Sequence, residues 1–266
     1  MLSYDRSGPR GATPLLLVHA GICDRRMWEP VWPSLTAVRD VVRLDLRGYG
    51  ESAEQPTGPW SPRGDILDVV DHLGLDRAHV VGCSFGAGVS AELAIVRPEL
   101  VASLVLAAPC GALLTEKTDQ LAAAWELEGK AIEAGDIAAA VDANVTAWVD
   151  GPHRGPDEVP AAVRDAVRTM QRRNFDITAD WPDEVWESED ELAPEAHERL
   201  DEITAPTIVI SGDLDIDSIG LAADHVLAGV RGARGVHWPD VAHLPSMERP
   251  GDFTGLVLDW VARAAE

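Results

Sequence analysis

Short apolar runs recur along the chain, and most are followed within a few residues by Gly or Pro. Continuous apolar runs of four to eight residues are typical of strands buried on both faces, as in a parallel sheet. We predict strands at 14–18, 41–45, 78–81, 101–107 and 206–211, with an edge strand at 2–5 and a last strand near 235–238.

Helical spacing of apolar residues separates these runs. It predicts helices at 66–73, 84–96, 218–228 and 251–264, and a helix interrupted by prolines from residue 25 to 32. Strands that alternate with helices in this way favour an α/β fold with helices on both faces of a mostly parallel sheet. We expect six to eight strands.

The alternation stops between residues 111 and 200. This segment is rich in Ala and Glu, and its periodicity predicts helices at 118–134, 136–150 and 157–173, with no strand. Residues 183–202 hold ten carboxylates and one Arg, a composition typical of a solvated surface. The sequence therefore predicts a core domain of residues 1–111 and 201–266, with a helical insertion at 112–200 over the strand ends.

The run at 78–81 ends in Gly82-Cys83-Ser84-Phe85-Gly86, which precedes a helical pattern. A strand that turns sharply into a helix exposes its turn residue, and the two glycines make room for so tight a turn. Ser84 would then stand beside the positive end of a helix, a position suited to a nucleophile. The five-residue motif alone is common, so the rest of the chain must support it.

A serine nucleophile needs a base, and the base needs an acid that orients it. Of the eight histidines, only His243 follows the last strand and precedes the last helix, at the edge where ligands bind. The loop after strand 206–211 offers Asp213, Asp215 and Asp217 as acids, whereas the loop after 101–107 offers none.

The chemistry also needs donors for an oxyanion. The backbone N–H of Phe85, at the start of a helix, can supply one, and the loop after the first buried strand can supply another from Gly21 or Ile22. We expect His19, in the same loop, to stabilise the turn and to take no part in catalysis.

Together these motifs resemble the α/β-hydrolase superfamily, over residues 15–110 and 203–264. The matching segments are His19-Ala20-Gly21, Asp45 to Ser52, Gly82 to Gly86, Gly212-Asp213-Leu214-Asp215 and His243-Leu244-Pro245 with Glu248-Arg249-Pro250. The resemblance implies a Ser84–Asp215–His243 triad, because the family pattern Gly-x-x-Asp selects Asp215. It also implies that 112–200 is a cap inserted after the sixth family strand, with a pocket beneath it. The N-terminus is short for eight strands, which within the range of six to eight favours six or seven.

Composition limits the partners. The net charge of −23 would repel nucleic acid and anionic membranes. No run of 18 apolar residues and no apolar leader occur, and the three cysteines lack metal-ligand or disulfide spacing. We expect a cytoplasmic monomer or homodimer that acts on a small molecule without cofactor or metal.

We expect a serine hydrolase that cleaves a small-molecule carboxylic ester or lactone, similar to the esterase and enol-lactonase branch of the superfamily. Alternatives are a C–C bond hydrolase, an acyltransferase, a non-hydrolytic natural-product enzyme, or a receptor with poor turnover. Ser84 argues against dehalogenases and epoxide hydrolases, which carry Asp at this position. Candidate substrate contacts in the insertion are Trp125, Trp148 and Arg173, the last beside Arg172 and Asn174 as a possible carboxylate clamp.

Overall fold

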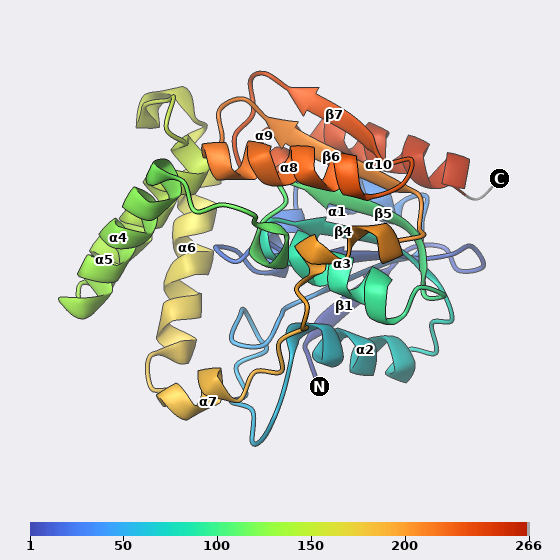
Figure 1. Ribbon diagram of the computed structural model, residues 1–266, viewed down its shortest axis with the longest axis horizontal. Helices are drawn as coiled ribbons and strands as arrows, with labels where there is room; N and C mark the ends of the chain where they lie inside the picture. Colours follow the sequence, from blue (N-terminus) through green and yellow to red (C-terminus); the bar gives the residue numbers. More distant parts are fainter. Residues whose placement is uncertain (265–266) are drawn as a thin grey trace.

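The computed structural model describes residues 1–264 and contains one seven-stranded sheet, ordered β1-β3-β2-β4-β5-β6-β7 (Figure 1). The strands are β1 Tyr4–Ser7, β2 Leu15–Val18, β3 Val41–Leu44, β4 Ala78–Cys83, β5 Val101–Ala107, β6 Thr207–Gly212 and β7 Arg234–Trp238. The predicted strands all form, and their number falls within the expected range.

Every neighbouring pair is parallel except β1 and β3, which are antiparallel. The edge strand begins at Tyr4, two residues later than predicted. Its four residues pair with β3, from Tyr4 opposite Leu44 to Ser7 opposite Val41. The parallel arrangement brings the carboxyl ends of β2 to β7 to one edge, where the loops predicted to carry the chemistry begin.

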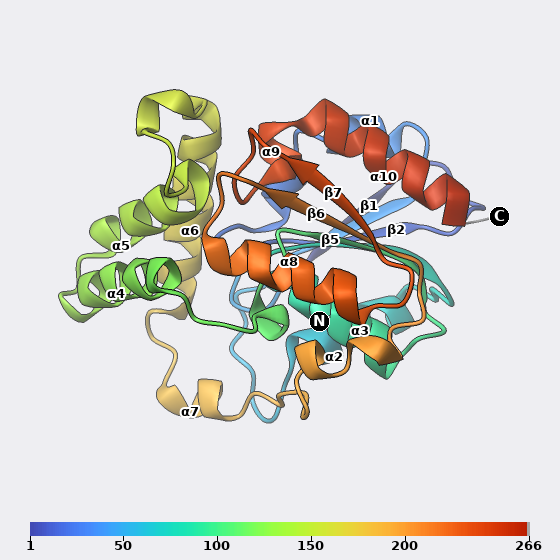
Figure 2. The same ribbon diagram turned by 45° about the horizontal axis from the view of Figure 1, so that its top comes forward.

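Helices cover both faces of the sheet (Figures 1 and 2). One face carries α2 Pro62–His72, α3 Phe85–Val96 and α8 Asp217–Gly229, and the other carries α1 Trp32–Thr36 and α10 Pro250–Ala264. Helix α2 begins four residues earlier than its apolar pattern, because the Ser61 side chain caps it by accepting a hydrogen bond from the Gly64 N–H. The predicted helix at 25–32 divides into a 3₁₀ turn, Arg25–Trp28, and α1.

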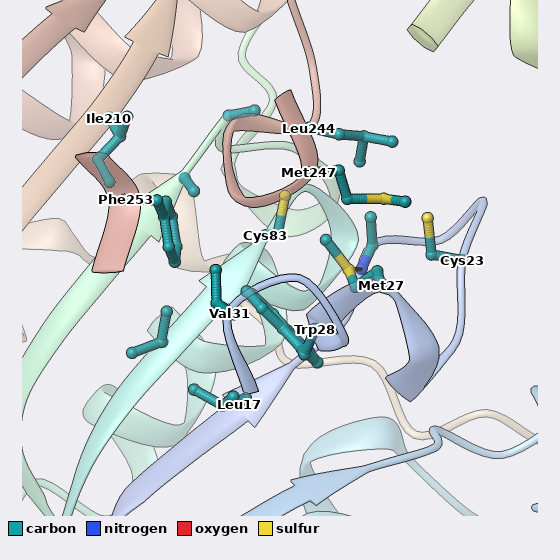
Figure 3. Packing of buried hydrophobic residues seen from close by; sticks show 14 of the residues in the cluster. Leu17, Cys23, Met27, Trp28, Val31, Cys83, Ile210, Leu244, Met247 and Phe253 are labelled. Carbon is teal, nitrogen blue, oxygen red and sulfur yellow. Dashed lines mark hydrogen bonds between the residues drawn. The ribbon is translucent and has the colours of Figure 1, made fainter. Parts of the chain in front are cut away.

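The alternation of side chains along each strand produces two hydrophobic cores. In β2, Leu15 and Leu17 face the core under α1 and α10, whereas Leu16 and Val18 face the core under α2, α3 and α8. Figure 3 shows the first core, where Leu17 lies near Trp28 and Val31. Burial on both faces explains why these strands read as unbroken apolar runs.

The insertion forms helices α4 Asp119–Glu133, α5 Ile137–Asn144, α6 Ala161–Thr178 and the short α7 Asp183–Glu187. They stand beside the end of the sheet toward which the β6 and β7 arrows point (Figure 1). The predicted helix at 136–150 is α5 followed by a π-helical turn, Val145–Asp150. The predicted helix at 157–173 starts after Pro160 and runs five residues further, to Thr178.

The remaining elements are short. They are the 3₁₀ turns Gly111–Leu113, Pro156–Glu158, Ala196–Glu198 and Leu200–Glu202, and the helix α9 Pro245–Glu248. Within residues 1–264, no helix combines the length and the apolar content needed to cross a membrane.

Candidate active site

Ser84 occupies a strained turn between β4 and α3. Its backbone has φ 54° and ψ −120°, a conformation that residues with a side chain rarely adopt. A Cβ at Gly82 would overlap the Gly86 carbonyl, and a Cβ at Gly86 would overlap the carbonyls of Val18 and His19. Both glycines are therefore required for β4, α3 and β2 to approach this closely, and the turn holds the Ser84 hydroxyl out of the chain.

His243 links this hydroxyl to a carboxylate. Its Nε2 lies 2.7 Å from Ser84 Oγ, and its Nδ1 lies 2.8 Å from Asp215 Oδ2. Since an ionised carboxylate can only accept, Nδ1–H donates to Asp215, which leaves Nε2 to accept from the serine hydroxyl. All three side chains are buried, so these hydrogen bonds are shielded from water.

Contacts from two segments hold Asp215 and His243 in place. Asp215 also accepts the Ile216 N–H at 2.8 Å, which fixes its carboxylate beyond the end of β6. The Trp148 ring packs against the His243 ring, with centroids 4.4 Å apart. Trp148 is buried and belongs to the π-helical turn of the insertion, so the insertion helps to hold the imidazole.

Glu248 secures the loop that carries His243. Its carboxylate accepts the N–H groups of Ala242 and Leu244, the two residues that flank the histidine. Arg154 of the insertion pairs with the same carboxylate at 2.7 Å, and both side chains are largely buried. Neither role was predicted from the sequence. Glu248 belongs to the segment that resembles the hydrolase family, whereas no local pattern indicates a role for Arg154.

The loop after β2 lies beside the start of α3. The Cys23 N–H bonds to the Ala20 carbonyl, which places Gly21 and Ile22 at the tip of a turn. Within residues 1–264, no hydrogen bond takes up the N–H groups of Ile22 or Phe85. Two donors on neighbouring loops are the arrangement that an oxyanion requires.

His19 holds this loop in place through two hydrogen bonds. Its Nδ1–H donates to the Ala20 carbonyl and its Nε2 accepts the Leu46 N–H, both at 2.9 Å. Burial lowers the pKa of His19, which keeps the ring neutral and able to accept. Its contacts are those of a structural residue, as expected from the sequence.

A model of the alpha/beta hydrolase fold matches residues 13–216 of this chain. The chain belongs to the alpha/beta hydrolase fold family. It is 24% identical to 3-oxoadipate enol-lactonase 1 of Acinetobacter baylyi over 255 residues, which are 95% of this chain and 90% of that protein. The crystal structure of the enol-lactonase from Burkholderia xenovorans superposes with a TM-score of 0.76 at 25% identity, covering 98% of this chain and 96% of that one.

A third relative is matched only in part. The dihydrolipoyllysine-residue acetyltransferase component of the acetoin cleaving system of Pseudomonas putida is 40% identical over 118 residues. These residues are 42% of this chain but only 30% of that protein, so the chain spans less than a third of it. The matches identify an α/β-hydrolase enzyme, as the sequence predicted.

The other candidate acids of this α/β hydrolase lie outside the hydrogen-bonded chain. Asp213 is exposed and contacts the exposed His237, with 2.6 Å between Oδ1 and Nε2. Asp217 begins α8 and accepts hydrogen bonds from the Thr118 hydroxyl and the Ser218 N–H.

The candidate substrate contacts lie in different places. Trp125 is 40% exposed and lies against the Lys117 ammonium group. Arg173 is exposed, donates to the Gly50 carbonyl and lines a hollow of about 420 Å³ whose lining does not include Ser84. Of the three, only Trp148 contacts a member of the Ser84–His243–Asp215 chain, and it does so through His243.

Two cysteines lie close to the Ser84–His243–Asp215 chain: Cys110 beside Ser84 and Cys83 beside His243. Burial raises the pKa of Cys110 to about 11, although the Gly111 backbone and the Ser84 side chain lower it in part. Cys83 lies 3.6 Å from the His243 carbonyl, and burial raises its pKa strongly. Both thiols are therefore protonated at neutral pH and are weak nucleophiles beside Ser84. Among residues 1–264, no three His, Cys, Asp or Glu side chains are grouped to hold a metal ion.

Proposed function

We propose that this α/β hydrolase cleaves a small-molecule carboxylic ester or lactone through an acyl-enzyme. The observation that carries the proposal is the continuous hydrogen bonding from Ser84 through His243 to Asp215. Similarity to two enol-lactonases over nearly the whole chain supports the same reaction class. We assign the roles of nucleophile, base and orienting acid to these three residues.

The reaction begins when Ser84 Oγ attacks the carbonyl carbon while His243 Nε2 takes the hydroxyl proton. The oxyanion accepts hydrogen bonds from the Phe85 N–H and from the Gly21–Ile22 loop. The tetrahedral intermediate collapses, and His243 returns the proton to the departing alcohol oxygen. Water then attacks the acyl-enzyme with His243 as base, and the carboxylic acid leaves as Ser84 regains its proton.

Residues 112–200 would act as the cap of this enzyme. Two contacts support that role. Trp148 packs against the His243 ring, and Arg154 pairs with Glu248, whose carboxylate secures the loop that carries His243. A cap that touches the histidine loop couples substrate enclosure to the position of the base.

The decisive test is covalent labelling with a fluorophosphonate probe. We expect the wild-type protein to be labelled at Ser84 and the Ser84→Ala variant to lose labelling. Hydrolysis of short 4-nitrophenyl esters should fall by on the order of 10⁶ in the same variant, as for other serine hydrolases. Intact-mass measurement and peptide mapping identify the labelled residue.

A folded wild-type protein that is never labelled and hydrolyses no ester would refute the proposal. Turnover of vinylogous diketones in the absence of ester turnover would instead assign the same residues to C–C bond cleavage.

A further inference from the structure

A hollow of about 200 Å³ opens beside the proposed oxyanion loop. It is lined on the core side by the loops after β2 and β3, and on the insertion side by residues of α4, α6 and α7. The lining residues that matter here are Gly21, Tyr49, Glu128, Gln171 and Phe175.

The hollow meets the proposed oxyanion loop at Gly21, and its lining, like that of the hollow beside Arg173, does not include Ser84. A Cβ added to Gly21 would lie 3.4 Å from the Phe85 Cβ and 3.8 Å from the Tyr49 hydroxyl. Phe85 follows the nucleophile and supplies one proposed oxyanion donor. Because Gly21 has no side chain, a substrate chain would meet none at that position.

The amide of Gln171 is buried in the wall and lacks a partner. Its side chain is nine-tenths buried, and its Oε1 makes no hydrogen bond. Leaving a buried polar group without a partner is destabilising. The neighbouring Asn174 amide is already used, because it donates to the Cys23 carbonyl and accepts from the Gly50 N–H. Among the residues that line the hollow, Gln171 thus has a buried Oε1 acceptor without a hydrogen-bond partner.

The hollow also carries negative charge. The Glu128 carboxylate accepts a hydrogen bond from the Asn144 amide at 2.8 Å, and within residues 1–264 it pairs with no cation. The lining Arg47 is bound by the Asp65 carboxylate and the Glu54 carbonyl, so its charge is compensated.

Tyr49 also lines the hollow. Burial, together with the charges of Glu189 and Glu128, raises the pKa of the Tyr49 hydroxyl to about 12. The hydroxyl therefore stays protonated and uncharged beside Gly21. An anionic ligand group entering this hollow would face Glu128 with no free cation to balance it.

We propose that this hollow binds the end of the substrate remote from the scissile carbonyl, and that it selects a hydrogen-bond donor there, a hydroxyl or an ammonium group, over a carboxylate. Glu128 and Gln171 accept from the donor, and Phe175 packs against the adjoining chain. This inference rests on the proposed ester or lactone hydrolysis and specifies its substrate class.

The alternative of a carboxylate clamp on α6 lacks support from the contacts. Arg172 is exposed and pairs with Asp176 on the same helix. Arg173 lines the separate hollow with Arg25 and Glu51, and Asn174 is committed to backbone groups. None of the three presents a free donor to the hollow beside Gly21.

The test uses esters that differ only at the remote end, which is methyl, hydroxymethyl, ammonium or carboxylate. One series varies the acyl chain and one varies the alcohol, and kcat/KM is measured for each. In at least one series we expect the hydroxyl and ammonium esters to exceed the carboxylate ester by about tenfold or more. In Glu128→Gln the ratio of ammonium to carboxylate should fall by about tenfold, whereas Glu133→Gln, an equal charge change on the exposed face of α4, should leave it unchanged.

Binding is measured separately in the Ser84→Ala variant, by the change in intrinsic tryptophan fluorescence on titration with the corresponding methyl esters. Trp186 lies in the wall of the hollow and contributes to this signal. The same order of Kd is expected. Equal Kd values for donor and carboxylate ends, or equal effects of the two Glu substitutions, would overturn the assignment of the hollow. Ratios within one variant do not depend on the fraction folded. Absence of fluorophosphonate labelling would instead refute the hydrolytic proposal, and the Kd order would still decide the hollow.

Discussion

Two aspartates separated by one residue have opposite environments. Asp215 is buried against His243 Nδ1 and the Ile216 N–H, whereas Asp213 is exposed and contacts the exposed His237. Both make an Asp–His pair, so the pairing alone does not identify the acid. What separates them is that only the His243 ring reaches Ser84 with its other nitrogen.

This difference predicts the outcome of a matched pair of substitutions. In Asp215→Asn the amide can donate to Nδ1, which favours the wrong tautomer, and kcat should fall by on the order of 10⁴. Asp213→Asn should change kcat less than twofold. Steady-state kinetics with a 4-nitrophenyl ester measures both, and thermal unfolding confirms that each variant is folded. Equal losses in the two variants would contradict the assignment of Asp215.

Residues of the proposed site differ in how far the sequence could identify them. Ser84, Asp215 and His243 each lie in a loop that follows a strand, so topology alone brings them to one edge. Arg154 and Glu128 come from the insertion, and their contacts depend on how helices pack. Helix packing depends on side-chain shape over long sequence separations, which periodicity does not encode.

At the scale of elements, the turn from β4 into α3 is the least tolerant part of the chain. Helix α3 packs so closely on β2 that a Cβ added to Gly86 would overlap the carbonyls of Val18 and His19. Gly220 lies within α8, is exposed, and has open space where a Cβ would be. The two glycines thus occupy helices of the same sheet face but differ in what surrounds them.

We therefore expect Gly86→Ala and Gly220→Ala to have opposite effects on stability. The first forces α3 away from β2 and should lower the free energy of unfolding by about 1–3 kcal/mol or more. The second restricts the unfolded chain and should raise it by about 0.4–1 kcal/mol. Urea denaturation followed by circular dichroism measures both. If Gly86→Ala were as stable as wild type, the space beside Gly86 would be large enough for a methyl group, and the predicted overlap with the Val18 and His19 carbonyls would be wrong.

Element boundaries were less predictable than element types. The buried strands were found because burial on both faces leaves only apolar residues. The π-helical turn at Val145–Asp150 was missed, since its periodicity resembles that of the α-helix before it. The end of α6 at Thr178 was also missed, because Asn174 and Thr178 are polar and their helical state depends on contacts with the core loops.

For the whole molecule, pH acts on stability in two opposite directions. The net charge of −23 makes exposed carboxylates repel one another, and protonation in acid relieves that repulsion. Buried histidines act in the other direction. Burial lowers the pKa of His79 from its ordinary value near 6.5 to about 4, with smaller effects of Arg39 and Arg77. His79 lies in β4, where its Nδ1 is 2.8 Å from the Ser103 hydroxyl.

The sign of the His79 contribution follows from proton binding. Between pH 6.5 and 4 the unfolded chain protonates this histidine and the folded chain does not, so acid favours unfolding by at most about 1.4 kcal/mol per pH unit. In His79→Asn that contribution is absent, while the amide can still bond to Ser103. The stability of wild type minus that of the variant should therefore decrease from pH 7 to pH 5. Urea denaturation at pH 7, 6 and 5 gives this difference, from which the shared carboxylate effects cancel. A difference that is constant with pH would mean that His79 takes up its proton equally in the folded and unfolded chain.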